Sequence, residues 1–224
     1  MSELPEVPLT FYAVDNCDEL VPQMSNVTYQ SLDILAELMK GRYPMELTRG
    51  QYPTELKERQ YPTELSEVQY PTEYSEGWHL NDSLEAPACD ISVSFGFMHH
   101  IPLHNHRAEV LSTLIGQTRP SGLVIISFWQ LLNDEGLSNK AQLTHEEALR
   151  DLRSQGLALA DLGEGDFLLG WENKPGAYRY CHSFSDAEID KLVESVAGRA
   201  TVVSRFMADG RTGNLNTYLI LKVL

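Results

Sequence analysis

Two aspartates stand directly after short strand-like segments near the beginning of the chain. Asp15 follows residues 9–14, and Asp33 follows residues 26–32. Open α/β sheets bind ligands at the carboxyl ends of their strands, where a carboxylate can accept both hydroxyl protons of a ribose. The spacing therefore predicts a ribose contact for Asp15 and an adenine amino contact for Asp33, with Ile34 flanking the ring. Aspartate is also a favoured helix N-cap, so a purely structural role stays open for both.

Histidines form the next group with possible chemistry, and four of them fall within eight residues: His99, His100, His104 and His106. The spacing of His104 and His106 could place two imidazoles near one ion. Metal hydrolase sites normally add acids close by, whereas Arg107-Ala108 follows here. We therefore expect no metal site. The predicted role of these histidines is in a helix start and a ligand-binding loop.

The three cysteines, Cys17, Cys89 and Cys181, are odd in number, widely separated and outside any C-x-x-C spacing. This usage predicts free thiols in a reducing cytoplasm. None of the three has the sequence context of a covalent nucleophile, and no Ser-His-Asp order or nucleophile elbow is present.

The elements that must position these residues alternate between strands and helices. Apolar runs predict strands at 9–14, 26–32, 90–95 and 122–128. Ala108, Leu111, Leu114 and Ile115 fall on one helical face, and Ser185 with Glu188 forms a capping box. Residues 200–207 and 216–224 predict a terminal antiparallel hairpin. The pattern indicates an α/β sheet that is mostly parallel with an antiparallel edge.

A nine-residue repeat interrupts this pattern at residues 41–76. Its four units begin Tyr43-Pro, Tyr52-Pro, Tyr61-Pro and Tyr70-Pro. A proline every nine residues forbids a continuous helix, so we expect a solvated loop inserted into a single domain of residues 1–224. The alternative is a multivalent ligand for a partner that reads Tyr-Pro motifs.

Charge and hydropathy restrict the class of protein. The chain has 32 acidic and 17 basic residues, a net charge of −15, which argues against a protein that coats nucleic acid. The longest apolar run, 123–129, is far shorter than the ~20 residues that span a bilayer. The acidic N-terminus does not resemble a secretory signal, and we expect a cytoplasmic protein.

Several segments resemble the class I S-adenosylmethionine-dependent methyltransferases. Asp90-Ile-Ser-Val-Ser-Phe-Gly-Phe-Met-His-His-Ile101 is similar to the end of the family's fourth strand, and Arg119-Pro-Ser-Gly122 is similar to the turn before its fifth. Tyr12-Ala-Val-Asp15 and Ser31-Leu-Asp33-Ile34 resemble the second-strand and third-strand motifs. The resemblance implies a Rossmann-like methyltransferase sheet that binds S-adenosyl-L-methionine and transfers its methyl group.

The resemblance also assigns roles to further residues. It implies that Phe95, Gly96 and His100 border the cofactor with Asp15, Asp33 and Ile34, and that Arg107 makes a surface or helix contact. The tract from Gly170 to Phe184 is similar to the Arg-Tyr-Tyr-His segment of the tRNA wobble-uridine carboxymethyl methyltransferases. This similarity implies that Arg179, Tyr180 and His182 orient the substrate, a tRNA or a small molecule. Cross-strand packing is the alternative role for these three residues.

The sequence departs from the family pattern in two places. Ser121 stands where the family has glycine, and no strand with a Gly-x-Gly loop precedes Asp15; Gly163-Glu-Gly165 lies in a later predicted loop. We therefore expect the family's first strand to be missing. A second hypothesis stays open: a non-catalytic relic or binding module that no longer holds the cofactor. Unpaired sheet edges would then favour self-association, and tRNA binding would need a basic helper subunit. The sequence assigns no catalytic residue.

Overall fold

The computed structural model describes residues 8–17, 19, 24–40, 80–156, 162–171 and 174–224. The predicted repeat loop at 41–76 lies outside the described residues. Contacts divide the chain into two compact units, Met1–Glu85 and Ala86–Leu224. Each unit is described by itself.

The first unit is built on two parallel strands, β1 (Phe11–Asp15) and β2 (Val27–Ser31), both of which the sequence predicted. The helix α1 (Ile34–Lys40) follows β2, and the 3-10 turn η2 (Leu80–Ser83) packs beside it. Ser83 fixes this turn, because its hydroxyl donates to Glu37 Oε2 at 2.8 Å and its carbonyl accepts from Gln30 Nε2 at 2.7 Å.

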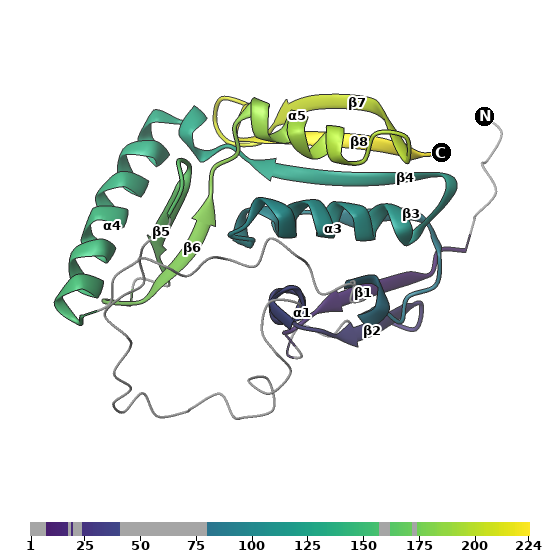
Figure 1. Ribbon diagram of the computed structural model, residues 1–224, viewed down its shortest axis with the longest axis horizontal. Coiled ribbons are helices and arrows are strands. Elements are labelled where there is room, and N and C mark those ends of the chain that lie inside the picture. The colour runs from purple at the N-terminus through teal and green to yellow at the C-terminus, as the bar shows by residue number, and fades with distance from the viewer. Residues whose placement is uncertain (1–7, 18, 20–23, 41–79, 157–161, 172–173) are drawn as a thin grey trace, which may run out of the picture. The chain divides into compact units, whose positions relative to one another are not determined.

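The second unit contains a four-stranded sheet in the order β3-β4-β8-β7 (Figure 1). The strand β3 (Cys89–Ser94) runs parallel to β4 (Thr118–Trp129). The strands β7 (Ala200–Ala208) and β8 (Asn216–Val223) form the predicted C-terminal hairpin, and β8 pairs antiparallel with β4. The α/β class and the antiparallel hairpin at the end of the chain are confirmed.

Two helices cover one face of this sheet: α3 (His104–Gly116) and α5 (Asp186–Ser195) (Figure 1). Alternate residues of the central strands point into this layer, and burying each large apolar side chain stabilises the fold by about 1.5–3 kcal/mol. The side chains in it that are at most 3% exposed are Val124, Ile126, Phe128, Leu219, Leu221, Leu111, Ile115, Ile189 and Leu192. The predicted Ser185–Glu188 capping box starts α5. The opposite face carries Ile91 and Val93, each 54% exposed.

A smaller layer lies beyond the carboxyl end of β4 (Figure 1). It consists of the antiparallel pair β5 (Asp166–Gly170) and β6 (Tyr178–His182) together with the long helix α4 (Glu135–Ser154). The Asp134 carboxylate caps α4 by accepting from Leu137 N at 3.0 Å. Leu131, Ala141 and Phe167 form the buried core of this layer. Neither α4 nor β5 was predicted from the sequence.

A bulge interrupts the pairing of β3 with β4. Cys89 pairs with Thr118, but Ile91, two residues later, pairs with Leu123, five residues later. The extra residues of β4 in the Arg119–Gly122 segment therefore form the bulge. Gly122 is required here, because an added Cβ would lie 2.6 Å from the Asp90 carbonyl oxygen. Ser121 has φ of 68°, the left-handed region that favours glycine.

The cysteines agree with the sequence prediction, since Cys17, Cys89 and Cys181 are all free thiols. Within the part of the chain that the structure describes, no helix is both long and apolar enough to cross a membrane.

Candidate functional site

Asp15 and Asp33 lie at the same edge of the first unit. Asp15 ends β1 opposite Ser31, and Asp33 follows β2 by two residues. Each carboxylate also organises its own loop: Asp15 Oδ1 accepts from Cys17 N at 2.9 Å, and Asp33 Oδ1 accepts from Ala36 N at 3.0 Å as an N-cap. Both side chains are exposed, and Ile34 beside them is partly buried. The structure thus brings together the three residues predicted to bind the nucleoside.

Phe95 and Gly96 occupy the corresponding position in the second unit, at the carboxyl end of β3. Gly96 N donates to Ser127 Oγ at 3.1 Å, which holds the loop against β4. Gly96 has φ of 66°, and a Cβ added to it would meet nothing within 4 Å. Phe95 is 55% exposed and makes an edge contact with Tyr218. This strand end therefore presents an open backbone beside an exposed aromatic ring.

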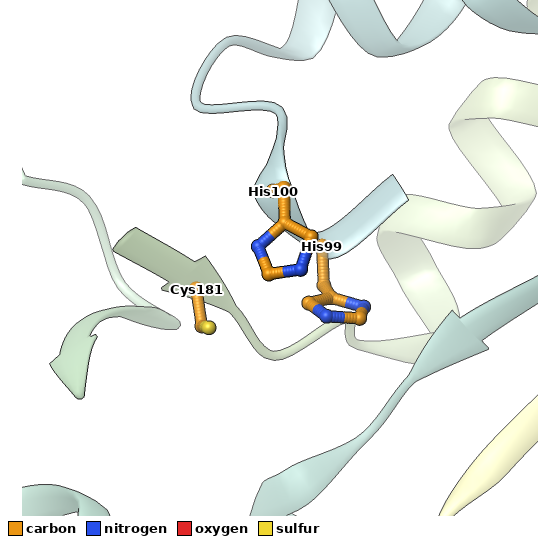
Figure 2. A group of neighbouring side chains, drawn as sticks. All are labelled: His99, His100 and Cys181. Atoms are coloured by element: carbon orange, nitrogen blue, oxygen red, sulfur yellow. The ribbon is translucent and has the colours of Figure 1, made fainter. Parts of the chain in front are cut away.

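The turn η3 (Met98–His100) follows directly and places His99 and His100 beside β6. The two imidazole centroids are 4.1 Å apart, and His99 also packs 5.0 Å from the Trp129 ring. Figure 2 shows Cys181 of β6 facing these two rings. One ligand atom from each of the three side chains lies within 4.8 Å of the others.

Burial governs the ionisation of this group. It lowers the pKa of His99 to about 3, with further lowering by His100 and by the Arg179 cation. The pKa of His100 is lowered by burial as well, although its hydrogen bond to the Tyr180 carbonyl opposes the shift. Burial raises the pKa of the Cys181 thiol. Both imidazoles are therefore neutral at pH 7.

The strand β6 divides the predicted substrate residues between two faces. Arg179 lies with Cys181 on one face, and its guanidinium stacks over the Trp171 ring at 4.7 Å. Arg179 Nε is buried and has no hydrogen-bond partner among the described residues. Tyr180 and His182 point to the other face, where their polar atoms join a buried network.

Arg107 is at the centre of that network, which corrects the predicted surface or helix contact. It is only 3% exposed, and it reaches from α3 to β6. Its Nε donates to the Ile101 carbonyl at 2.8 Å, and its Nη2 donates to the Tyr180 hydroxyl at 3.0 Å. Nη1 lies 3.2 Å from His182 Nε2. The prediction was wrong because the partners on β6 are more than 70 residues away in the chain.

Two carboxylates complete the network. Asp166 Oδ1 lies 2.6 Å from His182 Nδ1 and also accepts from the Tyr180 hydroxyl. Glu188 Oε1 lies 3.0 Å from His182 Nε2. Burial raises the pKa of Asp166, but hydrogen bonds from His182 and Tyr180 outweigh it, and the net shift is downward. The pKa of Glu188 is also lowered, because hydrogen bonds from Ser185 outweigh its burial. Sequence reasoning missed Asp166 and Glu188 as partners of this network; the Ser185 capping box was the only signal for Glu188.

No family model matches the chain, and no curated protein matches it. Among the solved structures that are similar to it at low identity are three methyltransferases. A SAM-dependent methyltransferase from Methanosarcina mazei shows 18% identity and a TM-score of 0.44, covering 64% of this chain and 64% of the other. The 1,6-didemethyltoxoflavin-N1-methyltransferase from Burkholderia thailandensis, with bound S-adenosylhomocysteine, shows 15% identity and a TM-score of 0.38 over 64% of this chain. That match spans 48% of the Burkholderia chain.

The N-methyltransferase NodS from Bradyrhizobium japonicum, in complex with S-adenosyl-L-homocysteine, shows 8% identity and a TM-score of 0.39. The match covers 96% of this chain and 78% of NodS. The chain thus spans less than two thirds of the length of the Methanosarcina and Burkholderia proteins.

Proposed function

We propose that the protein binds S-adenosyl-L-methionine and transfers its methyl group. The observation that carries this proposal is the placement of Asp15 and Asp33 at the carboxyl ends of a parallel strand pair. Exposed carboxylates at that edge suit a nucleoside, because they accept protons from ribose hydroxyls and from an adenine amino group. Ile34 supplies an apolar contact for the base.

Taken by itself, the second unit has residues whose chemistry suits contact with such a ligand. Phe95 offers an exposed apolar ring, and the open space beside Gly96 permits close approach to its backbone. His100 follows on η3 as a partly buried, neutral imidazole at this strand end. When bound, the cofactor would supply an electrophilic methyl group on a sulfonium. The chain would orient the acceptor so that its nucleophilic atom lies about 3 Å from the methyl carbon. It would also exclude water from the site.

Arg179 is our candidate for the acceptor contact. Its stacking on Trp171 fixes the guanidinium plane, and its buried Nε has no partner among the described residues. A buried donor without a partner costs about 1–3 kcal/mol, so an acceptor oxygen on the substrate would relieve this cost. Tyr180 and His182 support the contact by holding β6 in place. The acceptor is a small molecule or a tRNA, and with a net charge of −15 a tRNA would require a basic helper subunit.

A thermal-shift series with S-adenosylhomocysteine tests the proposed site. The ligand is expected to raise the melting temperature of the natural chain, and Asp15→Ala is expected to remove most of this shift. Glu146→Gln is the matched control, because Glu146 is an exposed acid on α4. Equal shifts in all three proteins would overturn the role of Asp15. No shift in any of them would support the non-catalytic alternative.

A transfer assay then separates the two acceptor classes. The chain is incubated with methyl-labelled cofactor and either total tRNA or a small-molecule extract. We expect label in the small-molecule fraction, and Arg179→Gln should weaken transfer through KM. Label confined to tRNA would favour the wobble-uridine similarity instead.

A further inference from the structure

His99, His100 and Cys181 make up a compact group of possible metal ligands, here called the His-His-Cys cluster. Two imidazoles and one thiol from separate elements, η3 and β6, converge within 4.8 Å (Figure 2). Among the described residues this is the only group of three His, Cys, Asp or Glu side chains placed to hold an ion. Cys181 is fully buried, and the two histidines are partly buried.

The surroundings orient the cluster as metal sites orient their ligands. His100 Nδ1 lies 3.3 Å from the Tyr180 carbonyl oxygen and can donate to it. A metal-bound histidine almost always donates its other nitrogen to a carbonyl or carboxylate, and this leaves Nε2 unprotonated for the ion. His99 is held by packing against Trp129. The Cys181 thiol makes no hydrogen bond to another described residue that would compete for its sulfur.

The donor set selects the ion. Imidazole and thiolate together suit Zn²⁺, whereas Mg²⁺ and Ca²⁺ require oxygen ligands. Zinc bonds of about 2.0–2.3 Å place tetrahedral ligand atoms about 3.5 Å apart. The ligand atoms of the three side chains would therefore move about 1 Å closer together when the ion binds. Rotations about their side-chain bonds can produce this movement.

We propose that His99, His100 and Cys181 bind one Zn²⁺ and leave its fourth position for an external ligand. The bond to Cys181 forms as the thiol loses its proton to solvent. The ion would tie η3, at the carboxyl end of β3, to β6. The sequence pattern indicated no metal site, because only His104 and His106 have a ligand-like spacing and Cys181 lies on a distant strand.

Arg179 determines the fourth ligand. A zinc ion with one thiolate and two neutral imidazoles carries one net positive charge, and the nearby guanidinium adds a second. Arg179 lies on the same face of β6 as Cys181, two residues away, which places its guanidinium beside the cluster. An anionic fourth ligand, such as hydroxide or a carboxylate, would balance this charge.

Metal titration of the full-length chain tests the proposal without any cofactor. The protein is stripped with a chelator and titrated with Zn²⁺ in competition with a chromophoric chelator, and then with Co²⁺ as a spectroscopic probe. We expect one ion per chain and a thiolate-to-cobalt charge-transfer absorption. Cys181→Ser should abolish that absorption and weaken Zn²⁺ binding by about 100-fold or more, since substitutions of outer-shell partners alone cost about 10- to 100-fold.

Matched controls use the same residue types outside the cluster. Cys89→Ser and His104→Gln should keep the stoichiometry, the affinity and the absorption of the natural chain. If Cys181→Ser does not fold, His99→Gln at a partly exposed position provides the second variant, with the same expected loss of affinity. Binding below half an equivalent, no charge-transfer absorption, or equal losses in the controls would overturn the proposal.

Discussion

The Arg107 guanidinium on α3 lies 3.2 Å from Nε2 of His182 on β6, 75 positions further along the chain. Glu188 Oε1 lies 3.0 Å from the same nitrogen. Nε2 therefore accepts from Arg107 or donates to Glu188, according to where the imidazole proton lies. Two carboxylates of opposite charge, Asp166 and Glu188, each lie 3.7 Å from the buried guanidinium.

Removing this cation should destabilise the second unit severely. Arg107→Ala leaves the Asp166 and Glu188 carboxylates without their neighbouring cation and the Ile101 carbonyl without its side-chain donor. Breaking a buried ion pair costs about 3–5 kcal/mol. Arg107→Lys should recover part of the loss, because it restores the charge without the planar fork. Chemical denaturation measures the free energy of unfolding of both variants. The exposed Arg211 serves as control, and Arg211→Ala should change the free energy of unfolding by less than about 0.5 kcal/mol. A loss for Arg107→Ala no larger than the control's would contradict the network.

The same network predicts how stability depends on acid. The folded pKa of Asp166 and that of Glu188 are both lowered. The unfolded chain therefore binds more protons below about pH 4, the ordinary carboxyl pKa, and stability falls as pH drops from there through the folded values. Asp166→Asn should be less stable than the natural chain at pH 7. The stability difference between the two proteins should narrow as the pH falls below about 4, because the natural chain then loses the same charge. Urea midpoints across this range that run parallel for the two proteins would refute the assignment.

The bulge before the apolar part of β4 allows a stabilising substitution. Ser121 has φ of 68°, a conformation that costs a non-glycine residue about 1–2 kcal/mol. Ser121→Gly should therefore raise the unfolding free energy by about 1 kcal/mol. Gly122→Ala is the opposing test and should lower it, because its Cβ would clash with the Asp90 carbonyl. Thermal or chemical unfolding measures both, and a destabilised Ser121→Gly would show that the serine hydroxyl has an unrecognised role.

The edge strand β3 should promote self-association. Its neighbour in the sheet is β4, and Ile91 and Val93 are each 54% exposed along it. Long apolar edges pair with other chains unless a charge or a proline protects them. Val93→Lys should lower the apparent mass in light scattering. Leu143→Lys, which changes an exposed leucine on α4, should not. A natural chain that remains monomeric at high concentration would contradict this prediction.

Local signals in the sequence predicted the elements whose determinants are close together in the chain. The Ser185–Glu188 capping box starts α5, and two long apolar runs give the β7–β8 hairpin. The helix α4 was missed because it is largely polar and has few buried positions, such as Ala141 and Ala148. Its stability depends on packing against β5, which no local pattern shows.

The candidate site was predicted only in part for a related reason. Asp15 and Asp33 were correctly expected at strand ends, because a short strand-like run precedes each of them. Arg107 was misjudged, and Cys181 was not connected to His99, since both contacts require β6 to fold back onto elements some 80 positions earlier in the chain. Contacts of that range are fixed by tertiary packing and leave no periodic trace in a single sequence.

Calorimetric titration of the full-length chain with S-adenosylhomocysteine is the most direct test of the proposed cofactor site. We predict saturable heat with one ligand per chain, which Asp15→Ala abolishes and Glu146→Gln preserves. The absence of heat at millimolar ligand, in a sample shown to be folded by circular dichroism, would contradict cofactor binding and leave a non-catalytic α/β protein.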